Sequence, residues 1–154
     1  VWDAQTGKEV LKYQADGLIS LAFSPDSNRL VGTACEGGRR DAAKSSVMKV
    51  WEAGTGKELF AVETPKGEVL NCAAFSPDGE WIATGGGGGK YQAVGEVLDA
   101  ATGREGARFN PKNGDAFDVV TIQVAFTPDG TRIVAANESM SVHVFPFERP
   151  AAKP

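Results

Sequence analysis

The sequence predicts an all-β fold made of three copies of one four-stranded unit. One phrase, Ala-Phe-Ser-Pro-Asp or a close variant, occurs at residues 22–26, 74–78 and 125–129. A second phrase, Asp-Ala-Gln-Thr-Gly-Lys or a close variant, occurs at residues 3–8, 52–57 and 99–104. Both phrases recur about every 50 residues, which is typical of an array of identical supersecondary units.

The strands are clearest in the middle unit. Four runs of 4 to 7 mostly apolar residues follow one another there, at residues 58–62, 69–75, 81–84 and 93–98. They are too short for helices and are bounded by Gly, Pro and Asp, which is typical of strands. The runs at 69–75 and 18–23 lack strict alternation, so we expect both of their faces to be covered by other sheets.

Two kinds of turn join these strands. Ser-Pro-Asp-Gly is typical of a type I turn, in which proline presets φ at the second position. The three prolines are Pro25, Pro77 and Pro128. Ser27 replaces the glycine in the first unit, which this turn type tolerates. The Thr-Gly loops need positive φ for tight hairpins. The glycines that supply it are Gly7, Gly56 and Gly103.

An aromatic residue precedes each Ser-Pro-Asp or Thr-Pro-Asp turn and is predicted to lie in the core. These residues are Phe23, Phe75 and Phe126. The residue two positions earlier is apolar in every unit and shares the same strand face. Trp51, at the end of a strand in the second phrase, is a further predicted structural residue.

The amino-acid composition disfavours several classes of function. The 154 residues carry a formal net charge of −4, which disfavours general nucleic-acid binding and adhesion to anionic membranes. Cys35 and Cys72 are too few for a disulfide framework, and we expect both to be small buried side chains. The sequence does not identify a compartment.

Together the two phrases resemble the WD-repeat β-propeller family. The resemblance rests on Val-Trp-Asp at residues 1–3, the Asp-Ala-x-Thr-Gly-Lys turn and the Ala-Phe-Ser-Pro-Asp-Gly turn. It implies four-stranded blades packed radially around a channel. Repeats this degenerate are similar to those of large bacterial WD-repeat proteins.

The resemblance also sets the predicted domain boundaries. Residues 1–147 form a partial propeller, and residues 148–154 form a C-terminal tail. Within the propeller, residues 1–7 end a preceding repeat, and three repeats follow at 8–52, 57–99 and 104–147. Closed propellers have about four to eight blades. We therefore expect the chain to be a piece of a longer protein that does not close a ring alone and that contacts missing blades of the same chain.

The sequence departs from the family at the Gly-His dipeptide that precedes the innermost strand. Those places read Asp16-Gly17, Lys66-Gly67 and Gly114-Asp115. The only histidine, His143, lies on a different strand. The hydrogen-bond network that the resemblance implies for a blade is therefore incomplete, and we expect apolar packing to replace it.

Variable connections gather at one end of the predicted blades, opposite the two uniform turns. Long connections in compact domains are usually functional or disordered. The candidate partner-binding residues on these connections are Arg39, Arg40, Lys90, Tyr91 and Phe117. Arginine and aromatic residues dominate binding hot spots. The alternatives are a solvated flexible loop for the arginines and packing on the same blade for the aromatics.

Nothing in the sequence points to catalysis, a cofactor or a metal. A single histidine and no Cys/His cluster leave no triad and no transition-metal site. The glycines at 85–89 do not form a phosphate loop, because Thr84 and Tyr91 break the motif; we expect a flexible connector there.

Two functions remain open for the chain. The first is a non-catalytic scaffold that binds other proteins through the variable-loop face. The second is an accessory propeller of a larger enzyme, such as a kinase or an electron-transfer protein, whose catalytic part lies upstream. A third arrangement, in which two copies close one ring, is disfavoured by the half-unit at the start of the chain. These inferences rest on analogy at the level of the fold.

Overall fold

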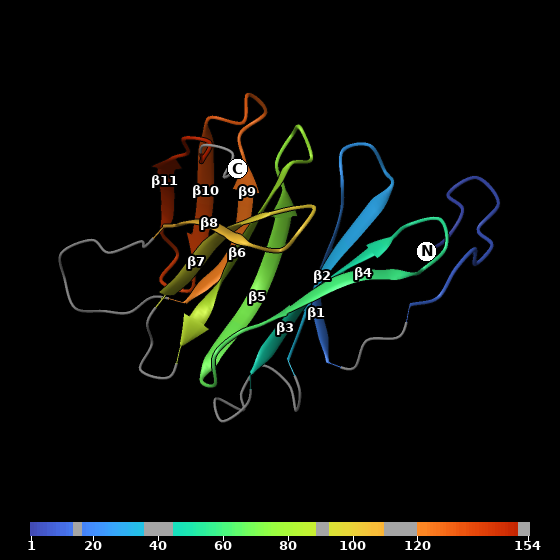
Figure 1. Cartoon of the computed structure of the whole chain (residues 1–154), viewed down its shortest axis with the longest axis horizontal. Coiled ribbons are helices and arrows are strands. Elements are labelled where there is room, and N and C mark those ends of the chain that lie inside the picture. Colours follow the sequence, from blue (N-terminus) through green and yellow to red (C-terminus); the bar gives the residue numbers. More distant parts are fainter. Residues whose placement is uncertain (14–16, 36–44, 89–92, 110–119, 151–154) are drawn as a thin grey trace.

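The computed structural model describes residues 1–13, 17–35, 45–88, 93–109 and 120–150. These residues form three antiparallel sheets placed side by side (Figure 1). The first blade contains β1 (Leu18–Phe23), β2 (Arg29–Cys35), β3 (Ser46–Glu52) and β4 (Glu58–Glu63). The second contains β5 (Glu68–Phe75), β6 (Trp81–Gly88), β7 (Ala93–Asp99) and β8 (Glu105–Arg108). The third contains β9 (Thr121–Phe126), β10 (Arg132–Asn137) and β11 (Val142–Pro146).

The blades pack through their faces, with the first strand of each on the inside. Strand β5 contacts β1 and β2 of the first blade on one side and β9 of the third on the other. The array is open, because the first and third blades lie at opposite ends of it (Figure 1). The predicted all-β propeller fragment is therefore confirmed. The described part of the chain contains no apolar helix of membrane-spanning length.

Both predicted kinds of turn are present. Each Pro-Asp turn closes with a hydrogen bond from its fourth residue to its first, as between the Gly79 amide and the Ser76 carbonyl at 2.9 Å. The Thr-Gly loops have positive φ at Gly56 and Gly103, 75° and 72°. Ser27 is a difference from the sequence expectation, since its φ of 61° lies in the left-handed region where a side chain is strained.

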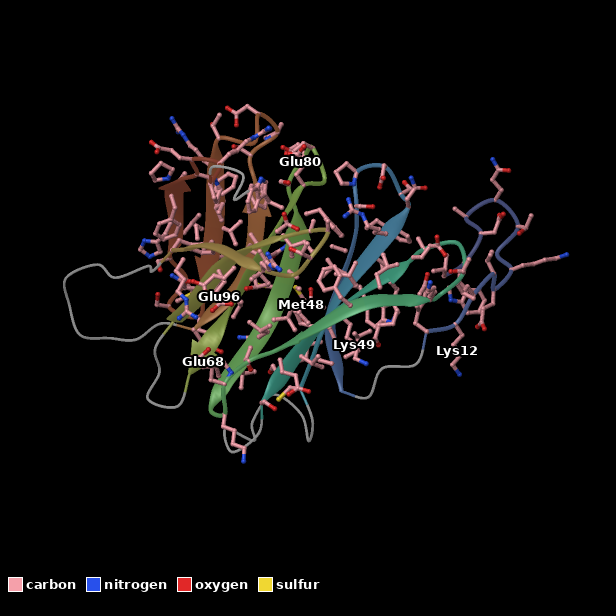
Figure 2. The ribbon with its side chains drawn as sticks, in the orientation of Figure 1. Lys12, Met48, Lys49, Glu68, Glu80 and Glu96 are labelled. Atoms are coloured by element: carbon pink, nitrogen blue, oxygen red, sulfur yellow. The ribbon has the colours of Figure 1, made fainter. Side chains whose placement is uncertain are left out.

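The first core lies between the first and second blades. It joins Met48, which is fully buried, to the second blade's own apolar residues (Figure 2). From the first blade come Val31, Met48 and Val50, and from the second Leu70, Ala73, Phe75, Ile82, Leu98 and Ala100. A second core between the second and third blades repeats the arrangement one blade further on. Its buried residues are Cys72, Ala83, Val97, Val124, Ile133, Ala135 and Phe147.

The prediction that Phe23 is a core residue is wrong. Phe75 is 9% exposed and Phe126 is partly buried, but Phe23 is 51% exposed. The cause is directional, because Phe75 and Phe126 both face the blade that precedes them. No described blade precedes the first, so Phe23 and its neighbour Leu21, also 51% exposed, face outward. The expected covering of both faces therefore holds for β5 and fails for β1.

The glycines at 85–88 belong to a strand, so the expected flexible connector is wrong for them. Gly87 pairs with Ala93, and β6 runs to Gly88. A Cβ on Gly85 would lie 2.6 Å from Thr121 Cγ2 and 2.9 Å from Val124 Cγ1. Glycine is required here because the third blade approaches the backbone of β6 this closely.

Buried hydroxyl groups mark the incomplete hydrogen-bond network. Thr33 on β2 and Thr84 on β6 are fully buried. Neither hydroxyl has a hydrogen-bond partner among the described residues. Thr121 differs, because its hydroxyl donates to Asn137 Oδ1 at 3.2 Å. The predicted reliance on apolar packing fits this pattern.

Replacing Thr84 with valine should raise the free energy of unfolding by about 1 kcal/mol, since a buried hydroxyl without a partner is costly. The matched control is Thr121→Val, which should lower it by about 1–3 kcal/mol, because Asn137 Oδ1 then loses its donor. Urea unfolding measures both. Equal effects of the two substitutions would contradict the assignment.

The loss of stability on truncating a phenylalanine should depend on the blade in which it lies. Phe75→Ala should lower the free energy of unfolding by about 3–5 kcal/mol, as for large aromatics in cores. Phe23→Ala should change it by less than about 0.5 kcal/mol in the monomeric chain, as exposed substitutions do. Denaturant unfolding of the two variants at low protein concentration is the measurement. A large loss for Phe23→Ala would mean that the first blade is covered.

Candidate functional site

The uniform turns share one end of the blades, which we call the turn end. The Ala100 amide, in a Thr-Gly loop, donates to the Glu80 carbonyl of a Pro-Asp turn at 2.8 Å. Ala53 and Phe147 make the same bond to Asn28 and Thr131. In Figure 2, Glu80 lies at this end, and Glu68 lies at the other. The prediction that both kinds of turn lie at the same end is therefore confirmed.

The predicted partner-binding residues lie outside the described residues. They are Arg39, Arg40, Lys90, Tyr91 and Phe117. Cys35 and Gly88, which end β2 and β6, lie at the end opposite the turns, since both strands begin at the turn end. The assignment of these five residues to an interface stays a prediction.

The turn end carries a groove that the sequence did not reveal. Its volume is about 640 Å³. It is bordered by Arg29 of the first blade, by both turns of the second blade and by the C-terminal segment. Its lining residues are Arg29, Asp78, Gly79, Glu80, Trp81, Asp99, Ala101, Thr102, Arg104, Glu105, Gly106, Arg149 and Pro150.

Arg29 fixes the first blade against both turns of the second. Its Nη1 donates to the Ala100 carbonyl at 2.9 Å, and its Nη2 donates to the Gly79 carbonyl at 2.7 Å. Its guanidinium lies 5.2 Å from the centroid of the Phe75 ring, within the range of a cation–π contact. Arg29 is therefore a structural cation, because both of its terminal nitrogens donate to backbone carbonyls of the next blade.

The C-terminal segment closes another side of the groove. Phe147 is buried, and its ring lies 6.0 Å from that of Trp81 and 5.4 Å from that of Phe126. Beyond it, Arg149 makes a 2.5 Å ion pair with Asp78 and a longer one with Glu80 at 3.8 Å. The predicted tail thus begins as an ordered strap across the second blade.

The carboxylates of the turns accept hydrogen bonds from their own turns. Asp129 accepts from the Thr127 hydroxyl and from the Thr131 amide, which lowers its pKa to about 2. In Asp78, burial alone would raise the pKa, but the Ser76 hydroxyl, the Glu80 amide and Arg149 hold it below its usual value. These groups stabilise turns, and the described residues contain no cluster of His, Cys, Asp and Glu that could hold a metal.

Glu96 on β7 is the exception, because its pKa is raised. Burial disfavours its charged form, and the Arg108 guanidinium at 2.8 Å offsets part of that effect. The pair crosses from β7 to β8. In the first blade, Lys49 occupies the position of Glu96 and pairs with Glu58 of β4 at 2.8 Å. Charged pairs between the third and fourth strands thus recur with reversed sign.

The sequence prediction missed Arg29, Trp81 and Arg149. Arg29 and Trp81 occupy the same position after the turn in successive units, and each reaches the following blade. Alignment of the repeats could have identified this position, whose third member is Arg132. Arg149 carries no such signal, because it follows the last repeated phrase.

Comparison with known proteins agrees with this geometry. The family model described as WD domain, G-beta repeat, matches residues 56–90. Mouse telomerase protein component 1 is 33% identical over 111 residues, covering 69% of this chain and 4% of that protein. Drosophila melanogaster WD repeat-containing protein 26 homolog is 27% identical over 160 residues, covering 97% of this chain and 22% of its own length. Tetrahymena thermophila cilia- and flagella-associated protein 251 is 25% identical over 158 residues, which is 95% of this chain and 14% of that protein.

Repeats, fold and similarity agree, and the chain belongs to the WD-repeat family. It spans less than a quarter of the length of each of these three relatives. Proteins of this family generally act as protein-interaction scaffolds, and WD40 domains are typically non-catalytic.

Acid should destabilise the turns. A carboxyl whose folded-state pKa lies below its unfolded value contributes stability above the unfolded value, which is lost as the pH falls toward the folded one. For Asp129 that window runs from 3.8 to about 2. We expect the free energy of unfolding to fall as the pH is lowered through this window. Asp129→Asn should reduce the slope of the free energy of unfolding against pH. Thr127→Val, which removes the donor hydroxyl, should reduce it as well. An unchanged slope in both variants would contradict the assignment.

Proposed function

We propose that the chain is a non-catalytic interaction module that binds other proteins through its variable-loop face, opposite the turn end. The observation that carries the proposal is the difference between the two ends. At the turn end, Arg29, Arg149 and the turn aspartates use their hydrogen-bonding groups within the chain. Turns constrained in this way leave little freedom for recognition.

The opposite end is where the sequence varies most between units. In the sequence, Arg39 and Arg40 follow β2, and Lys90 and Tyr91 follow β6, two strands of neighbouring blades that both end opposite the turns. Arginine and tyrosine are the side chains that carry most binding energy in protein interfaces. A protein partner is favoured over nucleic acid, since the net charge of −4 provides no general attraction for phosphate.

Alanine substitution in these loops tests the proposal. Arg40→Ala or Tyr91→Ala should weaken binding of a purified partner by about 1 kcal/mol or more, as at interface hot spots. Their stability should change by less than about 0.5 kcal/mol. Titration calorimetry measures affinity, and denaturant unfolding measures stability.

Two controls at the turn end complete the design. Lys57→Ala lies in a Thr-Gly loop, and Glu80→Ala changes an exposed residue of the groove. Both should bind the partner normally. If either control loses binding while Arg40→Ala and Tyr91→Ala bind normally, the partner binds at the groove and the proposal is contradicted.

A second candidate function is that of an accessory propeller in a larger enzyme. The observation in its favour is that the relatives are several times longer than this chain. The reading frame of the complete protein distinguishes the two, because a catalytic domain upstream would favour the second.

A further inference from the structure

Four buried side-chain oxygens lack a hydrogen-bond partner among the described residues. They belong to Thr33, Ser46, Glu68 and Thr84. The three residues that carry hydroxyl groups are at most 1% exposed. Buried polar groups are nearly always hydrogen-bonded, and departures from this rule are expected at functional sites. Several such oxygens in one place would therefore indicate a function.

All four side chains face the interface between the first and second blades. Each is two residues away, on its own strand, from a member of the first core. The pairs are Thr33 with Val31 on β2, Ser46 with Met48 on β3, Glu68 with Leu70 on β5, and Thr84 with Ile82 on β6. Residues two apart on a strand share a face of the sheet. We call these four residues the polar layer.

The polar layer lies at the end of the blades opposite the turns, which we call the loop end. Thr33 and Thr84 come after their core neighbours on β2 and β6, which run away from the turns. Ser46 and Glu68 come before theirs on β3 and β5, which run toward the turns. Figure 2 shows Glu68 at the end opposite Glu80. The polar layer therefore lies on the same side of the core as the variable connections.

Thr64 brings two members of the polar layer together. Its hydroxyl oxygen accepts a hydrogen bond from the Ser46 amide at 2.9 Å and donates to the Glu68 carbonyl, 2.8 Å away. The first residues of β3 and β5 are therefore neighbours across the interface. Their backbones are satisfied by Thr64, whereas the Ser46 hydroxyl and the Glu68 carboxylate oxygen have no partner among the described residues.

The polar layer borders carboxylates that share a single cation. Glu96 on β7 faces the same interface, since Leu98, two residues later, belongs to the first core. Arg108 pairs with Glu96 at 2.8 Å and with Glu105 at 2.9 Å. Burial raises the pKa of Glu96, Arg108 lowers it, and Glu105 and Glu68 raise it further. Glu68 makes no ion pair among the described residues, so this site carries an excess of negative charge.

The interface between the second and third blades differs. Thr121 is fully buried there, and its hydroxyl donates to Asn137 Oδ1 at 3.2 Å. The Asn71 side-chain amide donates to the Thr121 carbonyl at 3.1 Å. No buried side-chain oxygen in the described part of this interface lacks a partner. The unpartnered oxygens are therefore a property of one interface and not of the blade itself.

We propose that the polar layer receives a lysine or arginine side chain of the protein partner, with Glu68 as its ionic acceptor and the Ser46 hydroxyl as a further acceptor. This inference rests on the proposed function, because the partner must bind at the loop end. A cationic side chain supplies both the donors and the charge that the layer lacks. An apolar side chain would leave the Glu68 oxygen unpaired, and an acidic one would be repelled. Glu68 is only partly buried, which gives access from this end.

Substitutions in the polar layer should affect stability and binding differently. In the free chain, Ser46→Ala removes a hydroxyl without a partner and Glu68→Gln removes an unpaired charge, so neither should lower the urea midpoint of unfolding. In the complex, each removes an acceptor of the cation and should weaken binding by about tenfold or more. A residue that serves only the fold would show the reverse, a lower midpoint with unchanged affinity.

Peptides selected from a random dodecapeptide library displayed on phage provide the probe. The selection uses the full chain, and titration calorimetry measures the affinity of the purified peptides. Peptides that bind at the loop end, identified by weaker binding to Arg40→Ala or Tyr91→Ala, should carry lysine or arginine. Replacing that residue with norleucine should weaken binding to the wild-type chain by about tenfold or more, and should have little effect on binding to Glu68→Gln. Glu63→Gln, which changes an exposed glutamate at the loop end of β4, is the matched control and should bind normally.

The outcomes separate this inference from the proposed function. Loop-end peptides without a basic residue, or with equal affinity for the wild-type chain and Glu68→Gln, would overturn the inference and leave the proposed function intact. A selection in which no peptide is sensitive to Arg40→Ala, Tyr91→Ala or Glu68→Gln would contradict both. A lower urea midpoint for both Ser46→Ala and Glu68→Gln would also overturn the inference, because the polar layer would then stabilise the free chain.

Discussion

Apolar packing between neighbouring blades is the interaction on which this structure depends. Each four-stranded sheet is too thin to bury both of its faces alone, so a blade depends on its neighbours for stability. Three fully buried residues illustrate this. Met48 and Ile82 lie on the facing surfaces of the first two blades, and Ala83 lies on the side of the second blade that meets the third. The middle blade is covered on both sides, and each end blade has one exposed apolar face.

Polar groups determine how the blades are aligned. Arg29 crosses from one blade to both turns of the next, and Trp81 reaches Phe147 from the same position one repeat later. These contacts concentrate at the turn end, where aspartates and hydroxyl groups also fix the turn geometry. The opposite end carries the connections that differ between units. This division explains why one end can vary in sequence while the blades remain aligned.

Much of the fold was predictable, because turns and periodic apolar strands are local features. The strands, both turns and their shared end follow from the repeated phrases. Phe23 was not predictable, since its exposure depends on which neighbour exists and not on its own sequence. The glycines at 85–88 suggest a connector in the sequence, because the close tertiary contacts that require glycine in this strand, such as the approach of Thr121 and Val124 to Gly85, are visible only in the fold. The groove could not be predicted from the sequence, because it depends on tertiary contacts. Arg149 and Asp78, which form an ion pair beside it, are 71 positions apart in the chain.

The most direct test of inter-blade packing is a double-mutant cycle on Met48→Ala and Ile82→Ala. Both side chains are fully buried in the core between the first and second blades, but they come from different blades. Residues that share a core show coupling energies of about 0.5–3 kcal/mol, whereas independent sites add within about 0.3–0.5 kcal/mol. The account predicts coupling of at least about 0.5 kcal/mol in urea unfolding of the four proteins. Additive losses would contradict it, because they would mean that the two blades are stable independently of one another.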